Sequence, residues 1–79
     1  MKTIEKLFGA AVRKRRLELG LSQEDFADKA EIHRTYVSSI ELGKVQVSIA
    51  VAQKLATALE KPLSRIWREI ESAGEIAAS

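Results

Sequence analysis

Residues 22–43 read SQEDFADKAEIHRTYVSSIELG, and this stretch decides the fold. Ser22 can cap a helix that begins at Gln23, because its side-chain oxygen can accept a hydrogen bond from a backbone N–H that the first turn leaves free. The apolar residues that follow recur at helical spacing and give this helix one buried side: Phe26, Ala27 and Ala30. The pattern breaks at Glu31, so the helix has room for only seven or eight residues.

A second short helix follows the break. It begins at His33 or Arg34 and runs to Leu42, and Gly43 ends it because glycine adopts the left-handed conformation without strain. Its inward-facing anchors are Val37 and Ile40. Two helices that are too short to be stable alone, joined by a turn of three or four residues, are typical of a helix-turn-helix, which we place at residues 23–42.

The outer face of the second helix is polar when its anchors face the core. Its members are Arg34, Thr35, Ser38, Ser39 and Leu42. A helix held in this way can enter the major groove of DNA by its N-terminal end, where Arg34 can form two hydrogen bonds with a guanine. An ordinary solvent-exposed face contains the same residue types, so the pattern alone leaves Thr35 and Ser39 open as base contacts.

The rest of the chain has a helical period as well, and it predicts three more helices. Three residues can cap them: Thr3, Ser48 and Ser64. Gly20 ends the first helix, and Pro62 ends the fourth. The apolar residues at helical spacing are Ile4, Leu7, Phe8, Ala11 and Val12 in the first helix, Ile49, Ala52, Leu55, Ala56 and Leu59 in the fourth, and Ile66, Trp67 and Ile70 in the fifth. We therefore expect an all-α, five-helix domain over residues 1–79, with the fifth helix at about 64–72 and a frayed tail at 73–79.

The composition excludes several classes of protein. The 79 residues form one small domain, and 46% apolar residues are enough for a core. The chain has no cysteine and one histidine, so we expect no disulfide, no metal site and no cofactor. No apolar run approaches the length of a membrane span, and the N-terminus lacks a secretory signal, so we expect a cytoplasmic protein. The net charge is only +2, and the basic run at 13–16 is as consistent with a solvated helix face as with a surface for phosphate.

Two segments carry a family resemblance. Residues 15–30 (RRLELGLSQEDFADKA) and 36–44 (YVSSIELGK) resemble the phage repressor/Cro (XRE) family of DNA-binding proteins. More narrowly, residues 33–38 (HRTYVS) and the pair Ile40 and Glu41 resemble the controller proteins of bacterial restriction–modification systems. The resemblance extends from about residue 8 to about residue 67, and it implies a five-helix repressor-like fold with a helix-turn-helix.

The resemblance also implies roles for residues at matching positions. The residues that would face base edges are Arg34, Thr35 and Ser39. The residues that would contact the DNA backbone are Gln23, Tyr36, Ser38, Lys44 and Gln46. An internal salt bridge between the first and third helices would join Arg16 to Glu41. The residues that would lie at the twofold axis of a homodimer are Leu63, Ile66, Trp67 and Ile70.

The sequence departs from the family pattern at several positions. Glu31 stands where the turn usually has glycine, so a non-glycine residue has to adopt a positive φ, at a cost of about 1 kcal/mol. His33 stands where the controllers usually have an aspartate that caps the recognition helix. The positions that are often polar, basic or proline in the family are here Leu42, Val45 and Val47.

The leading hypothesis is a homodimeric transcriptional regulator that binds a palindromic or repeated operator, because a twofold dimer doubles the contacts and sets the half-site spacing. The expected partners are double-stranded DNA, a second copy of the chain and RNA polymerase, with no membrane and no small-molecule ligand. A controller would regulate its own gene and an endonuclease gene. Three alternatives stay open: a phage-type repressor, an antitoxin-like autoregulator and a helical protein-interaction adaptor. We expect no enzyme, because the chain has no acid–base constellation, nucleophile pair or phosphate loop.

Overall fold

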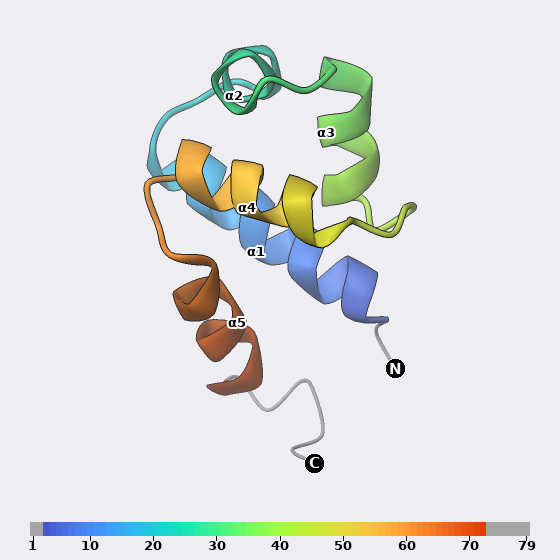
Figure 1. Ribbon diagram of the computed structural model, residues 1–79, viewed down its shortest axis with the longest axis vertical. Helices are drawn as coiled ribbons and strands as arrows, with labels where there is room; N and C mark the ends of the chain where they lie inside the picture. The colour runs from blue at the N-terminus through green and yellow to red at the C-terminus, as the bar shows by residue number, and fades with distance from the viewer. Residues whose placement is uncertain (1–2, 73–79) are drawn as a thin grey trace.

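Five helices follow one another in residues 3–72, the part of the chain that the computed structural model describes (Figure 1). They are α1 (Ile4–Glu18), α2 (Gln23–Ala30), α3 (Arg34–Glu41), α4 (Ile49–Ala58) and α5 (Leu63–Ser72). The prediction of an all-α, five-helix domain is confirmed, and residues 3–72 contain no strand. The predicted frayed tail at 73–79 lies outside the described residues.

Local sequence signals account for most of the helix ends. Thr3, Ser22 and Ser48 each accept a hydrogen bond from the backbone N–H three residues later, at 3.2, 3.0 and 3.1 Å, so the three predicted caps are confirmed. Gly20 and Gly43 follow the ends of α1 and α3 with left-handed φ values of 71° and 70°. Each glycine turns the chain there at no steric cost.

The prediction for the connection between α4 and α5 is wrong at two points. α4 ends at Ala58, and Glu60 turns the chain with a φ of 55°, so Pro62 lies beyond the helix rather than ending it. Pro62 instead lies directly before Leu63, the first residue of α5. Its carbonyl oxygen accepts a hydrogen bond from the Arg65 backbone N–H at 2.9 Å, and its ring-restricted φ suits the start of a helix. Ser64 therefore lies inside the first turn of α5 and does not cap it.

α2 and α3 lie at one end of the molecule and α5 at the other (Figure 1). α1 packs against α3 and α5, and α4 packs against α2 and α5, so the five helices enclose one core. The largest fully buried side chains come from all five helices: Val12, Phe26, Val37, Ile40, Leu55, Leu59 and Ile66. Ile49 departs from the predicted apolar side of α4, because its side chain is 85% exposed at the start of the helix. Ile49 instead lines an apolar groove at the surface, which is described below.

The backbones of α1 and α3 lie close together at Gly9. A Cβ atom built on Gly9 would lie 2.2 Å from the carbonyl oxygen of Ile40 and 2.8 Å from that of Glu41, so a larger residue does not fit. The helical period of the sequence gives no sign of this requirement, because the two segments are far apart in the chain. The contact seats the end of α3 directly on the backbone of α1.

Candidate nucleic-acid interface

α3 has an apolar side in the core and a polar side at the surface. Val37 and Ile40 are 0% and 1% exposed, which anchors the helix. Arg34 and Thr35 are exposed at its N-terminal end, and Ser39 is half-buried one turn further along. The three predicted base-contacting residues thus lie along the outer part of one short helix. The arrangement suits direct readout, since a helix presented in this way can place its first turn against base edges.

Two predicted backbone-contacting residues of α3 are less accessible. Tyr36 is half-buried, and its side chain packs against the hydrophobic core. Ser38 is also half-buried. Both side chains keep part of their surface exposed, which a contact to the sugar–phosphate backbone requires.

His33 caps α3 through its imidazole ring. Nδ1 accepts a hydrogen bond from the Thr35 backbone N–H at 3.1 Å, so the ring replaces the aspartate expected from the resemblance. Because Nδ1 accepts, the proton of the neutral ring is on Nε2, which leaves one N–H donor at the exposed N-terminal end of α3. The sequence does contain a signal for this cap. His33 stands directly before Arg34, the first residue of the helix, and its ring nitrogen can accept a hydrogen bond as an N-cap side chain does.

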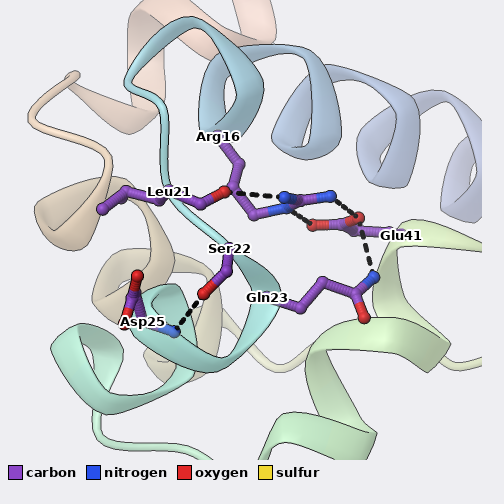
Figure 2. Close-up of polar contacts among 6 residues, drawn as sticks. All are labelled: Arg16, Leu21, Ser22, Gln23, Asp25 and Glu41. Carbon is purple, nitrogen blue, oxygen red and sulfur yellow. Dashed lines mark hydrogen bonds and ion pairs between the residues drawn. The ribbon is translucent and has the colours of Figure 1, made fainter.

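A buried ion pair joins the last turns of α1 and α3 (Figure 2). Arg16 Nε donates to Glu41 Oε2 at 2.6 Å, and Arg16 Nη2 donates to Glu41 Oε1 at 3.0 Å. The third donor, Arg16 Nη1, reaches the carbonyl oxygen of Leu21 at 2.8 Å. The side chains of Arg16 and Glu41 are only 8% and 2% exposed, so the pair is held in a desolvated, bidentate geometry. The structure thus brings together the two residues that the resemblance implies as a salt bridge.

Gln23 takes part in the same network. It is the first residue of α2, and its Nε2 donates to Glu41 Oε1 at 3.2 Å (Figure 2). Its side chain is half-buried rather than free at the surface. The family resemblance implies Gln23 only as a phosphate ligand. Its hydrogen bond to Glu41 could not be predicted, because it joins the two ends of the motif that are furthest apart in the sequence.

The turn between α2 and α3 has the strained backbone that the sequence predicts. Glu31 adopts φ 59° and ψ 42°, in the left-handed region, and its N–H caps the end of α2 by bonding to Ala27 and Asp28 carbonyl oxygens. The side chain itself is exposed. Glutamate therefore occupies a conformation that glycine adopts without strain.

The loop after α3 separates its polar residues from its apolar ones. Lys44 and Gln46, both predicted to contact the DNA backbone, are exposed. Val45 and Val47, which stand at positions that are often polar in the family, are half-buried and pack against the core. The two valines thus hold the loop against the core, and the side chains of Lys44 and Gln46 face solvent.

The basic run at 13–16 is not a single surface. Arg16 is buried in the ion pair, and Arg15 Nε donates to the Leu59 carbonyl oxygen at 3.1 Å, where it caps the end of α4. Arg13 and Lys14 alone are fully on the surface. The run is therefore divided between structural and solvent-facing roles, and its four charges do not act together on a phosphate.

Two carboxyl groups outside the candidate interface, those of Glu60 and Glu69, have lowered pKa values. The hydrogen bond from Lys29, at 2.7 Å, lowers the pKa of Glu60, and the hydrogen bond from Lys61 lowers the pKa of Glu69. Both carboxyl groups are at the surface, so the pairs contribute little to stability. Any contribution is present above the ordinary pKa of glutamate and is lost as the pH falls through the lowered value.

α5 divides its apolar residues between the core and the surface. Ile66 and Ile70 are 2% and 6% exposed inside the protomer's own core, so they have little surface left for a partner. Trp67 is 37% exposed and packs edge-on against Phe8, with ring centroids 6.1 Å apart. Of the four residues predicted for a dimer, Leu63 and Trp67 are the ones that remain accessible.

Leu63 and Trp67 line a groove of about 400 Å³. Its other apolar walls come from the first half of α1, the loop before α4 and the start of α4: Ile4, Phe8, Val47, Ile49 and Ala52. Glu5 and Gln46 add polar atoms to its lining, so Gln46 borders both this groove and the candidate interface. No residue of α2 or α3 lines the groove, so the outer face of α3 itself is a separate surface. In residues 3–72 no helix is both long and apolar enough to cross a membrane, and no cluster of potential metal ligands is found in this range.

Comparison with known proteins places this arrangement among regulators. A family model described as Helix-turn-helix matches residues 12–66, which include all of α2, α3 and α4. The control protein C.MunI of a Mycoplasma species is 42% identical over 72 residues, which are 90% of this chain and 97% of that protein. The restriction–modification controller protein C.AhdI of Aeromonas hydrophila is 37% identical, with a TM-score of 0.76 over 78% of this chain and 94% of that chain. The controller protein C.Esp1396I, solved as a tetramer in complex with its natural 35 base-pair operator, is 26% identical, with a TM-score of 0.83 over 91% of this chain and 95% of that chain.

Proposed function

The chain belongs to the phage repressor/Cro-like helix-turn-helix family of DNA-binding transcriptional regulators, and we propose that it is the controller of a restriction–modification operon. The observation that carries the proposal is the 42% identity to a control protein over 97% of that protein's length. The family is one of regulators rather than enzymes, and the proposed role requires no catalysis by this chain. A regulator of this kind acts where the genome is, which in a bacterium is the cytoplasm.

The proposed interface assigns each part of α3 and its flanks a role. The residues proposed to read base edges are Arg34, Thr35 and Ser39. The residues proposed to contact the sugar–phosphate backbone are Gln23, Tyr36, Ser38, Lys44 and Gln46. Arg34 is the main specificity residue in this assignment, because it is exposed at the N-terminal end of α3 and a guanidinium can donate to two acceptors of one guanine.

The proposed protein partner is a second copy of the chain. The groove beside Trp67 is apolar, and at its edge Ile49 is 85% exposed, which is unfavourable in water. Association through this groove leaves both copies of α3 free. A twofold dimer would then place the two helices about 34 Å apart, facing successive major grooves of a palindromic operator.

Footprinting on the DNA upstream of the protein's own gene tests the proposal. We expect protection of a palindromic or repeated site, with half-sites about one helical turn apart. We also expect a methyltransferase or endonuclease gene beside the regulator gene. An Arg34→Ala variant is the matched control, because it keeps the fold and removes the proposed base contact. Equal binding of the upstream region and of random DNA by the wild-type protein would contradict the proposed function.

A further inference from the structure

The helix-turn-helix is tied together at both of its ends. At one end, the turn at 31–33 joins α2 to α3. At the other end, the first residue of α2 meets the last residue of α3, because Gln23 Nε2 donates to Glu41 Oε1 at 3.2 Å (Figure 2). Two short helices that cross at an angle diverge away from their turn, so a contact at the open end limits how far their crossing angle can change.

The carboxylate of Glu41, which accepts this hydrogen bond, is held in a fixed position. Its side chain is 2% exposed, and Arg16 holds both of its carboxylate oxygens. Arg16 also binds the Leu21 carbonyl oxygen at 2.8 Å, which positions the backbone just before α2. A hydrogen bond to a charged group is stronger than one between neutral groups, and a carboxylate that is already fixed keeps its direction.

The chemistry of the carboxamide gives Gln23 a second donor. A carboxylate accepts and cannot donate, so the NH₂ end of the amide faces Glu41. One of its two N–H groups is used there, and the other stays available to a phosphate. Gln23 can therefore contact α3 and the DNA backbone at the same time.

We propose that Gln23 is a positioning residue for sequence recognition, in addition to the phosphate contact that the proposed function assigns to it. Acting through Glu41, it sets the orientation of α3 relative to the DNA backbone on which α2 rests. This inference rests on the proposed function, and it deepens it. A residue that binds only phosphate affects all DNA sequences alike, whereas a residue that orients α3 affects the two-point contact of Arg34 with a base.

The test is the Gln23→Met variant, which keeps the length of the side chain and removes both N–H donors. The matched control is Gln53→Met, which makes the same chemical change at an exposed position of α4. Affinities are measured for an operator selected from random duplexes and for a random duplex, over a series of salt concentrations, with the melting temperature of each variant. We expect the ratio of operator affinity to random-DNA affinity to fall about tenfold in Gln23→Met, the scale of one hydrogen bond to a charged group, and to stay unchanged in Gln53→Met.

Equal losses on both duplexes would overturn the inference and leave Gln23 as a phosphate ligand. If Gln23→Met does not fold, Gln23→Asn replaces it, because the shorter amide cannot reach Glu41 but stays polar. A Gln23→Asn variant that keeps the wild-type ratio, or that also fails to fold, would overturn the inference as well. A wild-type protein that does not distinguish operator from random DNA would instead overturn the proposed function, and this inference with it.

Discussion

Glu31 shows how a single residue can lower stability at the centre of a functional motif. Its φ of 59° and ψ of 42° lie in the region that disfavours residues with a Cβ atom. The family pattern has glycine at this turn, and the geometry of the turn is kept here in spite of the glutamate. The strain is local, because α2 continues to Ala30, directly before Glu31, and α3 begins at Arg34.

We expect Glu31→Gly to raise the free energy of unfolding by about 1 kcal/mol or less, since the flexibility of glycine in the unfolded chain offsets part of the relief. In a domain of this size, 1 kcal/mol corresponds to a rise in melting temperature of about 4–8 °C. Thermal unfolding followed by circular dichroism measures the change. Glu31→Ala is the control, because it removes the carboxylate and keeps the Cβ atom. An equal gain in Glu31→Ala would show that the side chain, not the backbone, limits stability.

Arg34 and Lys44 should differ in how they contribute to DNA binding. Arg34→Ala should weaken operator binding by about 1–3 kcal/mol and random-DNA binding much less, because it removes a contact to a base.

Lys44→Ala should weaken the binding of operator and random DNA alike and reduce the slope of log K against log salt by about one unit, because one fewer counterion is released. Titrations of both duplexes over a range of salt concentrations separate the two. A uniform loss in Arg34→Ala would reassign Arg34 to phosphate, and an unchanged slope would remove Lys44 from the interface.

The contact between α1 and α3 depends on a pair of charges as well as on packing. Removal of one member of a buried pair leaves the other charge without a partner, at a cost of about 3–5 kcal/mol, which is a large part of the stability of a small domain. Arg16→Ala and Glu41→Ala should each lower the melting temperature sharply, and the double variant should lose less than the sum. Chemical denaturation of all four proteins completes the double-mutant cycle. Small and additive losses would mean that the pair does not stabilise the fold in solution.

The sequence predicts some helix ends correctly and others not. The correct predictions depend on residues that are close together in the sequence. The caps at Thr3, Ser22 and Ser48 depend on side chains within three residues, so the sequence predicts them. Ser64 is also a residue type that caps helices, but α5 begins one residue earlier, at Leu63, directly after Pro62. The helical period alone does not show which of the two start signals determines the helix end. The helical period also cannot tell that Ile49 faces solvent, because that depends on where α1 and α5 lie.

The candidate interface follows the same rule. Residue spacing along α3 places Arg34 and Thr35 on its outer face, and the structure exposes both. By contrast, Gly9 and the Gln23–Glu41 hydrogen bond involve segments that are distant in the chain, and no local pattern reveals them. The family resemblance supplied the pairing of Arg16 with Glu41, which spacing alone does not give.

The molecule as a whole presents two separate surfaces, one polar at α3 and one apolar at the groove beside α5. We expect Ile49→Glu to give a folded monomer, because the side chain is 85% exposed and its replacement leaves the core intact. Trp67→Glu should do the same, with some loss of packing against Phe8. Both variants should bind the operator weakly, since each monomer makes half of the contacts.

Sedimentation equilibrium at micromolar concentrations measures the association of the wild type and the two variants. Leu17→Glu is the control, because Leu17 is 51% exposed and lies outside the groove. A wild-type protein that is monomeric both free and on its operator would contradict the dimer. A dimer that persists in both groove variants, or that is lost in Leu17→Glu, would place the interface elsewhere.

The backbone contact at Gly9 has a consequence for how such regulators diversify. α3 rests on α1 through main-chain atoms, and its inner side chains complete the attachment. Arg34 and Thr35 are exposed outside the core, so both can be exchanged while the helix stays where it is. Under the proposed interface, a change at these few outward positions would alter the operator that is recognised while the fold stays the same.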